Sequence, residues 1–433
     1  MLDQLISERG STIRTTRPNS LKCSLNYRAL CQAVLICAGF WLPPPIVEAN
    51  EQELTPPLFS TKLGFDLESA PEVFNEVREL ILARYYSPEL TEQALYWAAI
   101  KGMLRHISPP AAPTQGRIWT AKQYQRVLDS LIGRQKSLGV KSHFDPNDGS
   151  LTVTHVTRGS PADGRLQIRD RIMRIDGQRL IGGNLGEIES RLNAPAKGEV
   201  SLTVVRDIQV IQLTLAPAEH NVPSLESGLL DERTAYLRVT RMTAGVAERA
   251  IERLKPWITQ GVDNIVLDLR GNEGGVFIEG LRLAELFLSP NTPMLNIVRE
   301  GKTAQRFVSG NDNPLNINIA LLTNKGTASA AEMTIAALVF AGRASSFGEA
   351  TYGKGIMEQT FTLQNQMRVR FIVGAMYTPT GSSWNDRGIK PTHEVPAKRG
   401  QVNQWLALNI SERSKTDTQL RRAWEHLRRS TQP

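Results

Sequence analysis

The sequence contains a serine and a lysine that could act together as nucleophile and base. Ser329 lies between an apolar run typical of a buried strand, residues 319–323, and one typical of a helix, residues 333–340. A turn from strand to helix exposes a side-chain hydroxyl and points the following N–H groups, with the positive end of the helix, at developing negative charge. A serine that only caps the helix is the alternative interpretation.

Lys354 follows 25 residues after Ser329, between Gly353 and Gly355, so neighbouring backbone can enclose it closely. Lysine serves as a base for a serine hydroxyl when its surroundings disfavour the charged form. All six histidines lie outside these motifs: His106, His143, His155, His220, His393 and His426. The sequence therefore favours a Ser329–Lys354 pair, working without a metal or cofactor, over a serine–histidine pair.

Two glycines follow a predicted apolar strand over residues 265–269. Gly274 and Gly275 would allow backbone N–H groups to point at one spot, as an oxyanion hole requires. Taken alone, such a pair can also simply end a strand.

The elements that must position these residues are predicted by hydrophobic pattern. Apolar strands alternate with longer helical stretches between residues 235 and 395, which predicts an α/β core. Upstream, residues 131–218 show short β-branched runs separated by turns. Three segments of this upstream region resemble a PDZ domain in order and spacing: residues 137–140, 159–162 and 175–178.

A PDZ domain offers the backbone N–H groups of a glycine-containing loop to a peptide's C-terminal carboxylate, while the peptide adds to the sheet as a strand. By this resemblance the peptide-binding loop would be Leu138, Gly139 and Val140. Arg169 precedes Asp170 where such domains usually have Gly-Asp, so that turn is expected to differ. A small β-barrel that only spaces other parts is the alternative.

Four motifs in the second half of the chain resemble the C-terminal processing (tail-specific) serine peptidases with a PDZ domain. They are LDLRGNEGG at 267–275, GTASAAE at 326–332, TYGKG at 351–355, and YTPTGSSW at 377–384 with GIKP at 388–391. The resemblance implies a crotonase-like α/β protease core and ATP-independent endopeptidase activity. It also implies that the partners are protein substrates with nonpolar C-terminal tails.

The same resemblance assigns roles position by position. It makes Ser329 the nucleophile and Lys354 its base, with an oxyanion hole formed by the N–H groups of Gly274 and Ala330. Gly275 is the alternative to Gly274.

One position departs from the family's pattern. The family commonly has a glutamine four residues after the lysine to orient it, and here that position is Glu358, followed by Gln359. Either Glu358 replaces the glutamine, or a bulge turns Gln359 inward. A carboxylate beside Lys354 would favour the ammonium form and oppose its use as a base. This departure leaves open a second class of function, a catalytically impaired PDZ-protease scaffold that captures tails without cleavage.

The first 49 residues are typical of an export signal. Basic residues precede an apolar run of fourteen residues, 29–42, which ends at three prolines. At about 1.5 Å per residue the run spans roughly 21 Å, less than the roughly 30 Å of a bilayer core. We therefore expect an exported, periplasmic or otherwise extracytoplasmic protein that is membrane-tethered only if this segment is not cleaved. All three cysteines lie within the segment: Cys23, Cys31 and Cys37.

Composition completes the picture. A net charge of +8 over 433 residues is a mild excess, typical of a solvated basic surface and not of a nucleic-acid-binding protein. We predict a multidomain α/β protein in which a PDZ domain (β-rich, small helices) is inserted ahead of the core. Its expected parts are a signal peptide (1–49), an N-terminal helical region (50–130), a PDZ domain (131–218), a serine protease core (219–400) and a C-terminal helical segment of the core (401–433).

Overall fold

The computed structural model describes residues 68–430, apart from 88, 109–115, 146–147, 181–187, 189–190, 193–197, 300–301, 303 and 399. The predicted signal peptide lies outside the described residues. The chain divides into two compact units, residues 1–74 and 75–433. Within the described ranges no helix combines the length and the apolar character that a membrane span requires.

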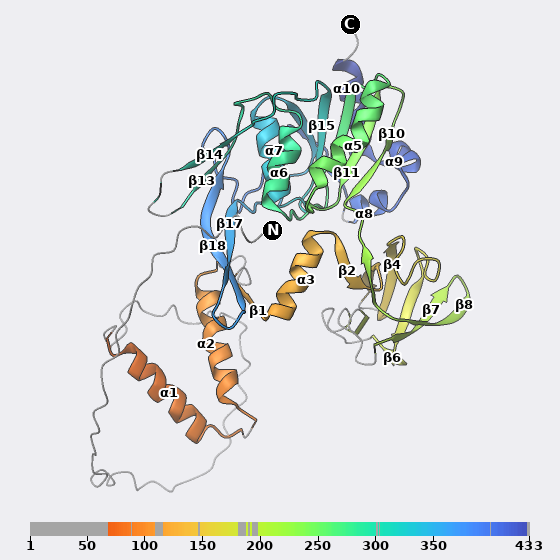
Figure 1. Cartoon of the computed structure of the whole chain (residues 1–433). Coiled ribbons are helices and arrows are strands. Elements are labelled where there is room, and N and C mark those ends of the chain that lie inside the picture. The colour runs from red at the N-terminus through yellow and green to blue at the C-terminus, as the bar shows by residue number, and fades with distance from the viewer. Residues whose placement is uncertain are drawn as a thin grey trace, which may run out of the picture. The chain divides into compact units, whose positions relative to one another are not determined.

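A six-stranded sheet forms the centre of the second half of the chain (Figure 1). Its order is β10-β11-β12-β15-β16-β19; the strands from β11 to β19 run parallel, and β10 is antiparallel to β11. The bounds are β10 (Leu225–Leu229), β11 (Thr234–Val239), β12 (Asn264–Asp268), β15 (Asn318–Thr323), β16 (Ala344–Gly348) and β19 (His393–Glu394).

Successive residues of the central strands belong to two different cores, because strand side chains alternate between the faces of a sheet. Leu237 and Leu267 belong to one core, whereas their neighbours Tyr236 and Val266 belong to the other. Helices cover both faces, which explains why these strands are apolar throughout. The first face packs against α5 (Val246–Thr259), α6 (Phe277–Glu285) and α7 (Ala330–Phe340).

The second face is covered by the last helix, α10 (Thr418–Ser430), which contributes Leu420 and Leu427 to that core. Two short helices precede it, α8 (Gln401–Leu406) and α9 (Ile410–Thr416). The α7 helix is apolar on all sides, and every residue from Ala330 to Leu338 is buried. A helix of that kind must lie inside the protein and not on its surface.

A buried ionic cluster joins α10 to the central sheet. Arg270, Asp268 and Asp417 have fully buried side chains, and Arg270 Nη2 lies 2.6 Å from Asp268 Oδ2 and 2.7 Å from Asp417 Oδ2. The Tyr236 hydroxyl donates to Asp268 Oδ2 at 2.7 Å. Burial opposes ionisation of Asp268, but the Arg270 guanidinium outweighs it and holds the pKa of Asp268 below its ordinary value.

A second, antiparallel sheet lies beside the motifs that contain the lysine. Its order is β1-β18-β13-β14, and β17 pairs with the opposite edge of β18, along residues 368–375. A register shift opposite Met357 and Glu358, where β18 has the unpaired residue Val373, marks a bulge in β18. The bounds are β1 (Arg117–Trp119), β13 (Pro293–Val298), β14 (Gln305–Val308), β17 (Ile356–Thr362) and β18 (Arg368–Tyr377).

The region predicted as a PDZ domain forms its own sheet and core, with the strand order β3-β4-β5-β7-β8 and β6 beside β5. Strand β3 is therefore at an edge. The bounds are β3 (Val140–Asp145), β4 (Ser150–Val156), β5 (Arg171–Ile175), β6 (Gln178–Arg179), β7 (Val200–Arg206) and β8 (Gln209–Leu215). A separate two-stranded ribbon pairs β2 (Arg134–Ser137), which enters this region, with β9 (Ala218–Asn221), which leaves it.

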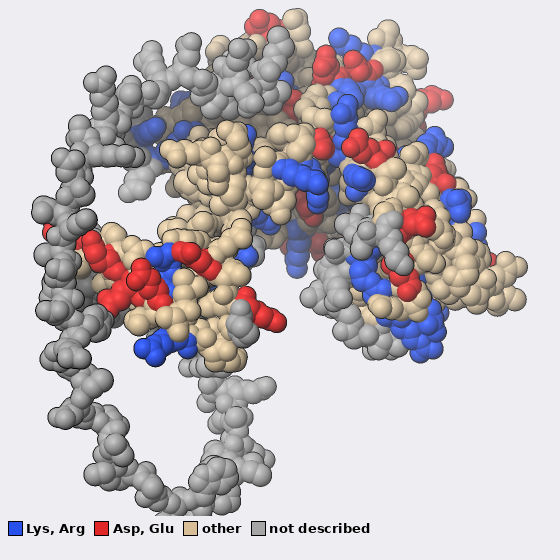
Figure 2. All heavy atoms as spheres, turned by 60° about the horizontal axis from the view of Figure 1, so that its bottom comes forward, with Lys and Arg blue, Asp and Glu red and all other residues tan. Residues whose placement is uncertain are grey.

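The N-terminal part of the described chain is helical, with α1 (Ala70–Arg84), α2 (Glu92–His106) and α3 (Ala121–Leu131). Threonines begin the last two: Thr91 accepts from the Ala94 N–H, and Thr120 forms a capping box with Gln123. On the face that Figure 2 shows, basic and acidic side chains are interspersed.

Candidate active site

Ser329 lies immediately before α7, at the carboxyl end of strand β15. Its φ of 56° is unusual for a residue other than glycine, and its side chain is half-buried. Such backbone strain persists only where the surrounding structure enforces it, and it is concentrated at functional sites. The first N–H of α7, that of Ala330, has no acceptor within the helix and lies next to Ser329.

The buried carboxylate of Glu332 enforces this turn. Its Oε2 accepts the backbone N–H of Ser329 at 2.8 Å and that of Lys354 at 2.8 Å. Its Oε1 accepts the Thr351 hydroxyl at 2.5 Å and the Gly353 N–H at 2.7 Å. One side chain thus ties the serine turn to the lysine segment.

Burial raises the pKa of Glu332 above its ordinary value, because a charge is costly away from water, although the four donors counteract this effect. Sequence reasoning did not identify Glu332 as a site residue. The signal for half of its role was present: Glu332 stands three residues after Ser329, which is the spacing of a capping box.

Residues 385–389 also hold the lysine segment in place. Thr351 and Ile389 exchange hydrogen bonds, from the Thr351 N–H to the Ile389 carbonyl at 3.1 Å and from the Ile389 N–H to the Thr351 hydroxyl at 2.7 Å. The Gly355 N–H donates to Asn385 Oδ1 at 3.0 Å. A side chain at Gly353 would lie 2.7 Å from the Gly388 nitrogen, so glycine is required for this approach. These contacts explain why the segments 377–384 and 388–391 accompany the lysine motif.

Lys354 Nζ donates to Glu358 Oε2 at 2.8 Å, and both side chains are largely buried. The bulge opposite Met357 and Glu358 accompanies this contact, whereas Gln359 pairs with Phe371 across the hairpin. The structure thus brings Glu358, and not Gln359, to the lysine.

The two glycines predicted for the oxyanion hole differ in their surroundings. The Gly274 N–H donates to Asn272 Oδ1 at 2.9 Å, so that group is already committed. Gly274 still lies against the serine turn, because an added Cβ would be 2.9 Å from the nitrogen of Ala330 and from Cβ of Ser329. Gly275 is exposed. The assignment of the Gly274 N–H to an oxyanion hole beside Ala330 therefore stays a prediction, with the Gly275 N–H as its alternative.

Asn272 is a second residue that sequence reasoning missed. Asn272 is fully buried. Its side-chain amide donates to the Val239 backbone carbonyl at 2.9 Å, and its backbone carbonyl accepts the Ala328 N–H at 2.9 Å. It therefore links the ends of three adjacent strands, β11, β12 and β15. No cluster of three or more metal-ligating side chains occurs in the part of the chain that the structure describes.

The peptide-binding loop predicted in the PDZ-like region connects β2 to β3. The Leu138 side chain is fully buried in the core of that region, so any contribution to recognition must come from its backbone. Gly139 has a φ of 78°, and an added Cβ would lie 2.1 Å from Cβ of Ser160. Val140 begins the edge strand β3 and is half-buried.

Comparison with known proteins gives matches over the same regions. The model of peptidase family S41 matches residues 233–395, and that of the PDZ domain matches residues 128–205. A carboxyl-terminal-processing protease of Synechocystis sp. is 27% identical over 332 residues, which cover 75% of this chain and 77% of that protein. Its counterpart in Picosynechococcus sp. is 29% identical over 330 residues, or 73% of this chain and 77% of that protein.

A solved S41 protease from Bacteroides fragilis has the same fold. It is 18% identical, with a TM-score of 0.57 over 82% of this chain and 98% of that chain. The two family models cover the regions that contain the serine, the lysine and most of the PDZ-like sheet. We conclude that the chain is a serine-type peptidase with a peptidase S41 region and a PDZ domain, similar to carboxyl-terminal processing proteases.

Proposed function

We propose that this protein is an exported, ATP-independent endopeptidase that cuts with a Ser329–Lys354 pair and selects proteins by their nonpolar C-terminal tails. The observation that carries the catalytic part is the position of Glu332. Its carboxylate accepts the backbone N–H of both Ser329 and Lys354, so the two residues are fixed around one point. Residues 1–49 would direct export, and the α/β core, with helices on both faces of its sheet, would be of the crotonase-like type.

In the proposed mechanism, a neutral Lys354 amine takes the proton of the Ser329 hydroxyl while Oγ attacks the scissile carbonyl carbon. The carbonyl oxygen becomes an oxyanion that accepts the N–H group of Ala330 and that of Gly274 or its alternative, Gly275. Lys354 then gives its proton to the leaving amine, and the C–N bond breaks. Water hydrolyses the acyl-enzyme at Ser329 by the same sequence of proton transfers.

Tail recognition is proposed for the edge of strand β3. An edge strand presents backbone groups to which an extended peptide can add, and β3 begins at Val140, directly after Leu138 and Gly139. The domain boundaries at residues 131 and 218 are consistent with this role, because the ribbon of β2 and β9 brackets the sheet.

Digestion of one reporter protein with two different tails tests the function. We expect a tail of nonpolar residues to be cleaved without added ATP or metal, and a tail ending in charged residues to remain intact. Capture of the nonpolar tail without any cleavage would instead support the scaffold function, for which the specific observation is the 2.8 Å contact of Lys354 Nζ with the Glu358 carboxylate in place of a glutamine.

Substitution of a loop glycine tests where the tail binds. Gly139→Ala forces an atom to within 2.1 Å of Ser160 and strains a positive φ, so we expect tail affinity to fall about tenfold or more. Gly159→Ala is the matched control, because its φ is also positive, at 75°, but an added Cβ meets nothing within 4 Å. Peptide titration followed by calorimetry measures both, and equal affinities would move the binding site away from this loop.

A further inference from the structure

Two cations face one carboxylate on the β17–β18 hairpin. Glu358 and Arg370 are diagonal neighbours on this hairpin, because Glu358 pairs with Ile372 and Arg370 with Thr360. Glu358 Oε2 lies 2.8 Å from Lys354 Nζ and 3.8 Å from Arg370 Nε. The carboxylate is therefore hydrogen-bonded to the lysine and only near the arginine.

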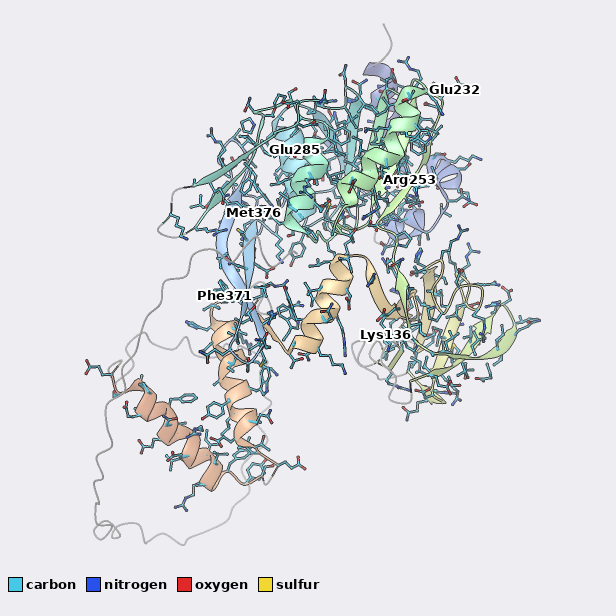
Figure 3. All side chains as sticks on the ribbon, in the orientation of Figure 1. Lys136, Glu232, Arg253, Glu285, Phe371 and Met376 are labelled. Carbon is cyan, nitrogen blue, oxygen red and sulfur yellow. The ribbon has the colours of Figure 1, made fainter. Side chains whose placement is uncertain are left out.

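Arg370 has an unused donor at this point. Its Nε is buried and has no hydrogen-bond partner among the described residues. Its guanidinium lies over the ring of Trp119 in strand β1, with the carbon 5.0 Å from the ring centroid. Phe371, labelled in Figure 3, is the next residue of β18 and marks this part of the hairpin. A buried donor without an acceptor is costly, and the nearest carboxylate oxygen is the one that Lys354 occupies.

A small movement would complete the arginine's hydrogen bond. The separation of 3.8 Å must shorten by about 0.6 Å to reach the roughly 3.2 Å limit of an N–H···O bond. Such a bond to a charged pair is stronger than one between neutral groups. The new bond would move the Glu358 carboxylate away from Lys354, and the lysine must lose a proton to act as a base.

We propose that Arg370 is a positioning residue that takes the Glu358 carboxylate from Lys354 and so releases the lysine to act as a neutral base. In the family's usual pattern a neutral glutamine orients the lysine. Here the Glu358 carboxylate would instead move between two cations, Lys354 and Arg370. The inference rests on the proposed Ser329–Lys354 mechanism, and it names a further residue that sets the pH range of that mechanism.

Other charged groups near the hairpin do not make this exchange. Glu332 contacts Lys354 at its backbone N–H and not at Nζ. Arg299 Nη2 lies 3.4 Å from Met357 Sδ. Arg117 stands opposite Arg370 in the register of β1 and β18.

The test is the pH dependence of kcat/KM for cleavage of the nonpolar-tail reporter. In Arg370→Met, Glu358 has Lys354 as its remaining partner, so we expect the acid limb of the profile to move about one pH unit to the alkaline side. On that limb the rate would be about tenfold lower at a given pH, with the alkaline plateau retained. A lower plateau without movement of the limb would mean that Arg370 only supports the hairpin, and the proposal would fail.

The matched control is Arg368→Met on the same strand. Arg368 also lies over an aromatic ring, that of Tyr124 at 5.6 Å, but its guanidinium donates to the Gln366 carbonyl. We expect the pH profile of Arg368→Met to match that of the wild-type enzyme. An equal shift in this variant would mean that the shift in Arg370→Met results only from the loss of a surface charge.

The Glu358→Gln variant distinguishes exchange of the carboxylate from direct repulsion between Arg370 and Lys354. Glu358→Gln should move the acid limb toward lower pH, and adding Arg370→Met to it should cause little further change. An undiminished shift in the double variant would show that Arg370 acts on the lysine directly and would overturn the exchange. If the unmodified protein shows no cleavage that depends on Ser329, the proposed mechanism itself is refuted. The failure of the mechanism and the failure of the exchange are therefore distinguishable.

Discussion

Ser329→Ala is expected to lower the rate of peptide cleavage by about 10³-fold or more while leaving the fold and tail binding intact. The substitution removes the attacking oxygen but keeps the backbone N–H that donates to Glu332 at 2.8 Å. It also keeps the Cβ that packs beside Gly274. Single-turnover cleavage of the reporter, with circular dichroism and peptide titration as parallel measurements, gives all three quantities.

The control is Ser382→Ala, an exposed serine in the segment that encloses the lysine loop. It should cleave at the wild-type rate. If Ser329→Ala retained a comparable rate, the nucleophile would have to be another residue and the role of the strained turn would need a different explanation.

Arg270→Met is expected to reduce the free energy of unfolding by about 3–5 kcal/mol, because it leaves Asp268 and Asp417 buried without their shared cation. Urea denaturation followed by tryptophan fluorescence measures the loss. Arg233→Met removes an arginine from an ion pair with Asp263 whose arginine side chain is 59% exposed, and it should cost less than about 1 kcal/mol. Similar losses in the two variants would mean that the buried cluster contributes no more than a surface pair.

The same cluster should make stability dependent on acid. The pKa of Asp268 is lowered in the folded protein, so the unfolded chain binds this proton more readily. The contribution is complete above the ordinary carboxyl pKa of about 4 and is lost as the pH falls through the lower folded value. Arg270→Met should therefore have a shallower fall in stability below about pH 4 than the wild-type protein.

The parts of the site that could be predicted from sequence are those that local pattern encodes. The apolar runs on either side of Ser329 identify a strand and a helix, and a serine at their junction can only occupy the turn. Glycines on both sides of Lys354 likewise indicate close backbone approach, and Gly388 and Asn385 supply it. The continuous apolar character of the central strands predicts burial on both faces of the sheet and therefore helices on both faces, and these strands are buried almost throughout.

The remaining features depend on contacts between distant residues. Glu332 can be recognised as a capping residue from its spacing, but its bonds to Thr351, Gly353 and Lys354 arise only when two loops meet. The commitment of the Gly274 N–H depends on the rotamer of Asn272, which no sequence pattern encodes. The choice between Glu358 and Gln359 accompanies a bulge at Val373 in the neighbouring strand β18, and a shift of one residue in pairing changes which side chains share a face.

The ion pair between Arg270 and Asp417 also constrains when the central sheet can be completed. These residues are 147 positions apart, and Arg270 immediately precedes the glycine-containing loop that faces Ser329. During synthesis, a chain that ends before residue 417 contains Arg270 without Asp417. The sheet face that α10 covers is then still open to water. The buried cluster can therefore be completed only after residue 417 has been made. Closure of this face of the central sheet is thus linked to synthesis of the last helix of the chain.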